Sequence, residues 1–183
     1  MQDRRLKMRK IVLFIAMSLD GYIADVDGKV DWLIGQDSDV ESNDSYEDFV
    51  NSVDTIIMGW KTYHQVITEL SPEQWVYDNL QSYVITHRKC TPKSNVMFVS
   101  KNPCVLVNEL KQKSGKDIWI CGGANIVRQL IQDNLIDKYY ISIIPTILGN
   151  GIRLFDVIDK KIDLRFISSK SSNGIVEVEY EKR

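Results

Sequence analysis

The sequence has few of the residues that build metal centres and disulfide frameworks. Its 183 residues include three cysteines and two histidines, with no CxxC motif and no Cys/His cluster. Structural zinc sites and disulfide scaffolds need such spacings, so we expect neither. The free thiols of Cys90, Cys104 and Cys121 are typical of a reducing compartment, and we expect a cytoplasmic protein.

Charge of one sign and long apolar runs are also missing. The net charge is -2, which argues against a general affinity for nucleic acid or an anionic membrane. Basic residues precede the apolar run 11–17, as in a secretory signal, but the run is short and Asp20 follows closely. It is also too short to span a bilayer. We interpret it as a buried first strand.

The length and composition predict one globular domain. With 44% hydrophobic and 26% charged residues, the chain can bury one core without disulfides. Residues 1–8 are interpreted as an N-terminal extension and residues 9–183 as the domain. Eight short runs rich in β-branched and aromatic residues predict strands at 10–17, 54–59, 82–86, 96–99, 117–121, 138–144, 164–168 and 175–181. Helical patterns lie at 45–53, 62–70, 103–113 and 125–133.

This order of elements predicts an α/β fold. The strands at 11–17 and 118–121 are continuously apolar, as expected where helices cover both faces of a sheet. The last two strands alternate between apolar and polar residues instead. They are joined through Asn173 and Gly174, a pair typical of a tight hairpin. We therefore predict a three-layer sandwich, with a mixed eight-stranded sheet that ends in an antiparallel hairpin.

Two strand-to-helix turns carry glycine, and each is a candidate phosphate site. The strand 117–121 runs into Gly122 and Gly123, where free backbone N–H groups at a helix start could face an anion. Gly59 ends the strand 54–59, and Lys61 and Thr62 follow it with a positive charge and a hydroxyl. A GxGxxG motif is absent, and plain tight turns are the alternative. Together, two such turns suit the two phosphates of a dinucleotide.

A third turn contributes cations. Thr86, His87, Arg88 and Lys89 follow the strand 82–86, where an adenosine 2′-phosphate could lie. An NAD-preferring site more often places Asp or Glu near the ribose, and none stands at this strand end, which favours NADP. A solvated basic turn is the alternative.

Candidate acids are harder to choose. Asp20 follows the first strand at its carboxyl end, where ligands of α/β proteins bind, and Asp44 precedes the helical pattern 45–53. Either carboxylate could donate a proton, while turn stabilisation by Asp20 and helix capping by Asp44 are the structural alternatives. Trp32 could stack on a substrate ring or close the core, and Trp60 could pack on the cofactor.

The motifs around these residues resemble a known family. Residues 15–24 (IAMSLDGYIA), 57–63 (IMGWKTY) and 120–124 (ICGGA) are similar to dihydrofolate reductases. Residues 145–155 (PTILGNGIRLF) look closer to a sister group, which includes the C-terminal reductase domain of the bifunctional riboflavin-biosynthesis deaminase/reductase. Two features depart from the family pattern: Trp60 stands where a cation is usual, and the segment 32–49 is longer than in dihydrofolate reductases.

The resemblance implies a dihydrofolate-reductase-like fold that binds NADPH across the carboxyl ends of the strands. It places Ala16 near the nicotinamide, and Asp20 and Trp32 at the border of the substrate pocket. Positions matched to the adenosine and phosphate side are Gly59, Lys61, Thr62, Thr86, His87 and Arg88. Those matched to the pyrophosphate and ribose are Gly122, Gly123, Ala124 and Asn125.

We therefore expect an NADPH-dependent reductase of a small heterocyclic or ribosylated substrate, closer to a riboflavin precursor than to folate. Alternatives are dihydrofolate reduction, a non-catalytic NADP-binding protein, and an interaction domain that binds no nucleotide. A homodimer is expected from the resemblance.

Overall fold

The computed structural model describes residues 8–37 and 46–183. In chain order its elements are β1 (Ile11–Ser18), β2 (Tyr22–Ala24), α1 (Tyr46–Ser52), β3 (Val53–Gly59), α2 (Trp60–Gln65), the π-helix η1 (Val66–Leu70), β4 (Gln81–Ile85), β5 (Val96–Val99), α3 (Pro103–Lys111), β6 (Asp117–Gly122), α4 (Ala124–Gln132), β7 (Lys138–Ile144), β8 (Ile152–Arg153), β9 (Leu164–Ser172) and β10 (Ile175–Lys182).

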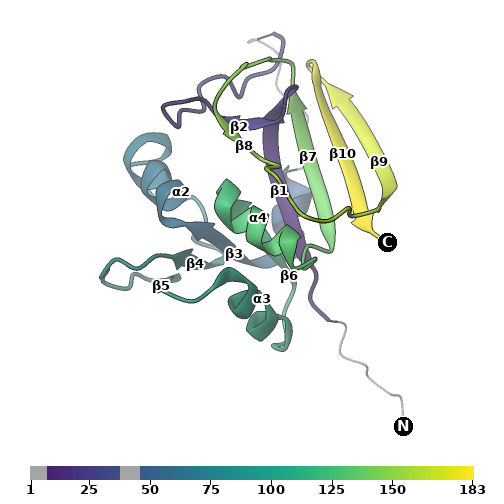
Figure 1. Cartoon of the computed structure of the whole chain (residues 1–183). Coiled ribbons are helices and arrows are strands. Elements are labelled where there is room, and N and C mark those ends of the chain that lie inside the picture. The colour runs from purple at the N-terminus through teal and green to yellow at the C-terminus, as the bar shows by residue number, and fades with distance from the viewer. Residues whose placement is uncertain (1–7, 38–45) are drawn as a thin grey trace.

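The main sheet has eight strands in the order β5-β4-β3-β6-β1-β7-β10-β9. The pairs from β5 to β7 are parallel, whereas β10 runs antiparallel to both β7 and β9. Because the six parallel strands share one direction, the turns that follow β3, β4 and β6 all lie along one edge of the sheet. The predicted mixed sheet with a C-terminal hairpin is confirmed (Figure 1).

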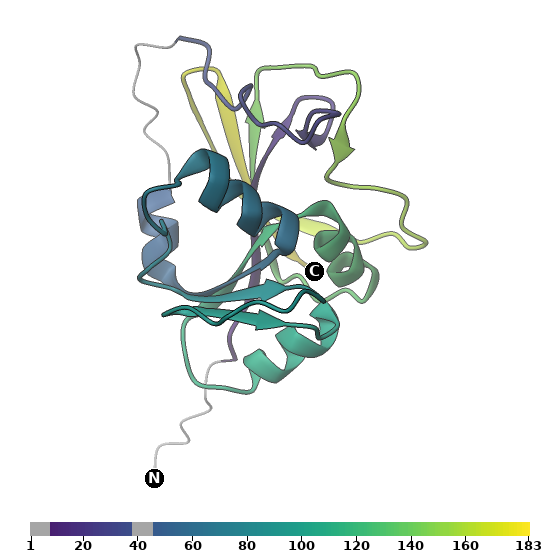
Figure 2. The same cartoon turned by 90° about the vertical axis from the view of Figure 1, so that its left-hand side faces the viewer.

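Helices cover both faces of this sheet, which gives the predicted three layers (Figures 1 and 2). One apolar core joins α3 and α4 to alternate residues of β1 and β6, such as Leu13 and Ile120. A second core on the opposite face contains Phe49 of α1 and Tyr63 of α2, packed with Trp119 of β6. Alternate residues of the central strands thus enter opposite cores, which explains their continuously apolar sequences.

Local sequence explains several element ends. Asn102 caps α3 by accepting hydrogen bonds from the N–H groups of Cys104 and Val105, and Pro103 occupies the first turn. Asn173 and Gly174 have φ of 49° and 75°, the left-handed values that a two-residue hairpin turn requires. β9 continues to Ser172, four residues beyond the predicted end, because its backbone stays paired with β10 up to that turn.

Two features differ from the sequence prediction. The second helix begins at Trp60 rather than Thr62, with Gly59 as its N-cap, and its last five residues form the π-helix η1. A two-stranded sheet of β2 and β8 was not predicted. These strands have three and two residues, too few to show a period, and they pair across more than a hundred residues of sequence. Among the described helices, none is long and apolar enough to cross a membrane.

Candidate active site

The glycine turns after β3 and β6 meet at the carboxyl edge of the sheet. The strands are parallel neighbours in which Met58 pairs with Gly122, so each turn begins beside the other. A Cβ built on Gly59 would lie 3.9 Å from Gly123 N, and one built on Gly123 would lie 3.6 Å from Thr62 Oγ1. The two turns therefore border one common space. Separate positions for Gly59 and Gly122 would have excluded a shared ligand.

Gly59 is a glycine that the fold itself does not require. Its φ of -84° and ψ of 165° are open to any residue. A methyl group there would make only ordinary contacts, with Ile126 Cδ1 at 3.4 Å as the nearest atom. Glycine at this position keeps the space between the turns open, as a ligand that approaches the backbone closely would need.

The second turn combines a required glycine with an uncapped helix start. Gly122 has φ of 130°, which side chains rarely allow, and a cis peptide bond joins it to Gly123. Gly123 is the N-cap of α4, and no side chain accepts a hydrogen bond from the N–H groups of its first turn. Those donors and the helix dipole favour an anion at Ala124 and Asn125.

The third predicted segment lies next to the first turn. β4 is the parallel neighbour of β3, with Ile85 paired to Gly59. The hydroxyl of the buried Thr86 accepts a hydrogen bond from Arg88 N at 3.1 Å, which shapes the turn after β4. Arg88 Cζ lies 5.1 Å from the centre of the Trp60 ring, within the range of a cation–π contact. His87, Arg88 and Lys61 are all exposed at this edge.

The contacts of Asp20 favour a turn-stabilising role over proton donation. Its carboxylate accepts hydrogen bonds from Ser18 Oγ at 2.6 Å, Leu148 N at 3.1 Å and Gly149 N at 2.7 Å. The bond from Ser18, together with those backbone N–H groups, lowers the pKa of Asp20 against the opposing effect of desolvation. A carboxylate stabilised in its ionised form is a poor proton donor near neutral pH. Asp20 instead ties the end of β1 to the loop after β7.

The other predicted substrate-side residues are less informative. Ala16 is partly buried near the end of β1, with its side chain on the face that carries Phe14. Trp32 is partly buried in a loop, and its Nε1 donates to Lys29 O at 3.3 Å. Asp44 lies outside the described residues. Its proposed role, and those of the residues above, stay predictions.

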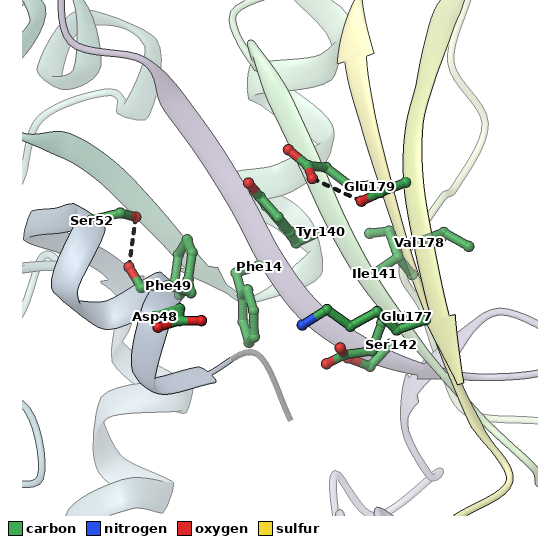
Figure 3. A pocket seen from close by; sticks show the side chains of 12 residues that line it. Phe14, Asp48, Phe49, Ser52, Tyr140, Ile141, Ser142, Glu177, Val178 and Glu179 are labelled. Atoms are coloured by element: carbon green, nitrogen blue, oxygen red, sulfur yellow. Dashed lines mark hydrogen bonds between the residues drawn. The ribbon is translucent and has the colours of Figure 1, made fainter. Parts of the chain in front are cut away.

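A hollow of about 240 Å³ opens between α1 and the strands β1, β7, β9 and β10 (Figure 3). Phe14 of β1 and Phe49 of α1 stack with ring centres 4.2 Å apart and form one wall. β10 supplies the opposite wall with Glu177 and Glu179, and β7 contributes Tyr140. The remaining lining residues are Asp48, Ser52, Ile141, Ser142, Ser168, Lys170 and Val178. Patterns in the sequence gave no sign of this hollow, because its residues come from five separate elements.

Acidic groups dominate the polar side of the hollow. Asp48, Glu177 and Glu179 line it together with a single cation, Lys170. Burial opposes the ionisation of Glu179, but hydrogen bonds from Tyr140, Lys138 and Ser168 outweigh it and lower the pKa of this carboxyl. The hollow thus offers aromatic surface and hydrogen-bond acceptors, and it suits an uncharged or cationic group better than an anion.

A second hollow of about 350 Å³ adjoins the start of α4. Ala124 and Asn125 line it together with Arg128, Arg153 and Asp156. Arg128 Nη1 lies 3.5 Å from the Asp156 carboxylate, and Arg153 Cζ lies 4.7 Å from the centre of the Tyr22 ring. The two arginines were not predicted as site residues. They add positive charge beside the proposed pyrophosphate position.

Two of the cysteines, Cys104 and Cys121, are not activated nucleophiles. Burial raises the pKa of Cys121, one residue before Gly122, to about 12. Burial, with Asp133 nearby, raises that of Cys104 to about 11. Thiols with these values stay protonated near neutral pH. Within residues 8–37 and 46–183, no three His, Cys, Asp or Glu side chains gather closely enough to hold a metal ion.

A mixed eight-stranded sheet between two helical layers, with glycine turns along its carboxyl edge, defines a dihydrofolate-reductase-like α/β domain. Residues 9–176 match the RibD C-terminal domain, and the chain belongs to this family. It is 37% identical to the uncharacterized protein YwjB of Bacillus subtilis over 94% of this chain and 97% of that protein. It is 26% identical to the riboflavin biosynthesis protein RibD of Haemophilus influenzae, over 78% of this chain and 49% of that protein.

Solved structures agree with this assignment. A putative riboflavin biosynthesis protein from Shewanella sp. PV-4 has a TM-score of 0.81 and 26% identity, over 95% of this chain and 99% of that chain. The deaminase/5-amino-6-(5-phosphoribosylamino)uracil reductase of Thermotoga maritima has a TM-score of 0.71 and 14% identity, over 97% of this chain and 57% of that chain. The expected resemblance to this reductase family is confirmed.

Proposed function

We propose that the chain is an NADPH-dependent reductase that transfers a hydride to a small heterocyclic or ribosylated substrate. The reaction would be of the 5-amino-6-(5-phosphoribosylamino)uracil reductase type. The observation that carries this proposal is the shared space between Gly59 and the turn of Gly122 and Gly123. The fold accepts a side chain at Gly59, so packing does not account for the glycine, and this supports a ligand that approaches the backbone there.

Each part of the cofactor has residues of suitable chemistry. The pyrophosphate would lie against the N–H groups at the start of α4, with the hydroxyl of Thr62 on the other side. Lys61 and Arg88 would face the adenosine 2′-phosphate. Bound NADPH would supply the hydride from its nicotinamide ring, which we place beside Ala16, and the proton that completes the reduction would come from solvent. The protein's part is to orient the two reactants.

The hollow beside Phe14 is our candidate for the substrate side. Phe14 and Ala16 are two residues apart in β1 and therefore face the same side of the sheet. A ring bound against Phe14 and Phe49 would lie next to the proposed nicotinamide position. The carboxylates and serine hydroxyls of the hollow can accept hydrogen bonds from amino groups of a heterocycle. A phosphate on the substrate would have to lie elsewhere, since three carboxylates face this space.

NADPH oxidation provides the direct test. It should be followed with pyrimidine–ribitol precursors, their phosphates and dihydrofolate as separate substrates. Turnover of the pyrimidines but not of dihydrofolate is the expected result. Ser168→Ala, which removes a hydroxyl from the hollow three strands away from β1, should raise KM for the substrate and leave the NADPH Kd unchanged. NADPH binding without turnover of any compound would refute catalysis and support the non-catalytic alternative, which the constrained Asp20 carboxylate also favours.

A further inference from the structure

Trp60 lies in the turn after β3, next to the turn after β4, and its ring packs on other aromatic side chains. It is the first residue of α2 and packs on Tyr63 and Phe98, with ring centres 5.7 and 6.4 Å away. Tyr63 itself contacts Phe98 edge-on at 5.3 Å, so the three rings form one small aromatic cluster. The ring also holds Arg88 Cζ at 5.1 Å, and Arg88 comes from the turn after the adjacent strand β4.

Arg88 has no acidic partner in the part of the chain that the structure describes. Its ion pairs and side-chain hydrogen bonds include none to a carboxylate, and its guanidinium rests on a neutral ring instead. The sequence around the two turns is free of acid: 55–68 and 79–108 contain no Asp or Glu. A guanidinium stacked on an aromatic face keeps its full charge and its in-plane N–H donors.

We propose that Trp60 is a positioning residue for Arg88, and that the stacked pair sets the preference for a nucleotide with a 2′-phosphate. This inference rests on the proposed function, because it assumes that the nucleotide lies along this edge. The ring holds the guanidinium in one place before the ligand arrives, so less side-chain freedom is lost when Arg88 contacts the phosphate. Trp60 thereby acts through Arg88 rather than through contact with the base.

Binding of adenosine 2′,5′-bisphosphate and adenosine 5′-monophosphate, measured by calorimetry, tests the pair without requiring any reaction. Arg88→Met should raise the Kd of the bisphosphate by roughly 10- to 100-fold, which corresponds to the loss of one charge-assisted hydrogen bond. The Kd of the monophosphate should not change. Trp60→Leu should raise the Kd of the bisphosphate by roughly 2- to 5-fold, as expected for the loss of an exposed cation–π contact. In the Arg88→Met background, Trp60→Leu should add nothing.

Three further variants make the outcome specific. Trp60→Phe keeps an aromatic ring for Arg88 and should retain most of the preference for the bisphosphate over the monophosphate. This result would distinguish a contact with Arg88 from a role of Trp60 in packing alone. Arg88→Lys keeps the charge at an exposed site but loses the planar stack, so an intermediate loss is expected even if Trp60→Leu does not fold. Lys113→Met removes a positive charge just before β6, at the opposite edge of the sheet, and should change neither affinity.

Contrary results are equally clear. Equal losses for both nucleotides in Trp60→Leu would show that Trp60 contacts the base itself, and would overturn the positioning role. Unchanged discrimination in Arg88→Met would overturn the specificity role. NADPH oxidation that persists in either case would leave the proposed function intact. Conversely, the protein could prefer the bisphosphate through Arg88 and yet have no reductase activity. That result would support the role of the Trp60–Arg88 pair and refute the proposed reductase function. A wild-type protein that bound neither nucleotide would overturn both.

Discussion

Replacing Gly59 by alanine tests whether the space between the glycine turns is reserved for a ligand. The φ and ψ of Gly59 are allowed for alanine, and the added methyl would lie 3.4 Å from Ile126 Cδ1 and 3.9 Å from Gly123 N. Alanine also has less backbone freedom in the unfolded chain, so stability should change by at most about 1 kcal/mol. For a protein of this size, that corresponds to roughly 2–4 °C in Tm.

Cofactor binding should respond very differently. The methyl would fill the gap beside Gly123 N and displace a phosphate from the backbone donors of the second turn. A lost charge-assisted hydrogen bond is worth about 1.5–3 kcal/mol, so NADPH should bind roughly 10- to 100-fold more weakly. Calorimetric titration with NADPH and thermal unfolding without it would measure the two effects separately.

Gly174→Ala provides the reverse pattern as a control. Gly174 has φ of 75° in the β9–β10 turn, and a Cβ there would lie 2.9 Å from Gln36 Cβ. The variant should lower Tm and leave the NADPH Kd unchanged, since its site is separated from β3 by several strands. If Gly59→Ala bound NADPH within about twofold of the wild type, the space would not belong to the cofactor and our reasoning would fail.

Further predictions concern other parts of the molecule. The lowered pKa of Asp20 means that its ionised form stabilises the fold above the unfolded-state pKa, and that this stability is lost as pH falls through the folded-state pKa. Asp20→Asn should therefore reduce Tm at pH 7 and converge with the wild type in acid; equal Tm values at pH 7 would contradict this. A thiol reagent at neutral pH should reach the buried Cys104 only on unfolding, and early labelling of Cys104 would contradict this. We expect a homodimer formed through the exposed apolar part of β9, where Phe166 is 57% exposed, and light scattering should show that Phe166→Arg is monomeric. A monomeric wild type would refute the homodimer.

Sequence patterns were sufficient for the main sheet because its central strands are continuously apolar and its last two strands are joined by a recognisable hairpin turn. β5 and β7 have the predicted bounds, because Asn95 and Ser100 border the apolar run of β5 and Pro145 follows the end of β7. β2 and β8 escaped prediction because their pairing depends on a contact between Tyr22 and Arg153, far apart in the chain. The early start of α2 at Trp60 has a local origin. Glycine can itself serve as an N-cap, so the helix begins directly after Gly59.

Asp20 shows where sequence reasoning about the site reaches its limit. Its position at the carboxyl end of β1 suits either a proton donor or a turn-stabilising residue. The two alternatives differ only in what the carboxylate contacts, and two of its partners, Leu148 and Gly149, are separated from it by over a hundred residues. No local pattern encodes that contact. The hydrogen bond from Ser18 lowers the pKa of Asp20 most, and the loop after β7 brings these N–H groups to the carboxylate, where they lower the pKa further.

The two sides of the proposed site differ in how they are encoded. The phosphate side is made largely of backbone atoms, and glycine is the residue that exposes them, so Gly59 and Gly123 mark it in the sequence. The substrate side is made of residues from α1, β1, β7, β9 and β10. No spacing in the sequence predicts that Phe14 contacts Phe49. Substitutions in the hollow can therefore change the substrate while the glycine turns stay as they are. Cofactor binding and substrate turnover therefore need separate assays in this family, since NADPH binding does not imply turnover of a given substrate.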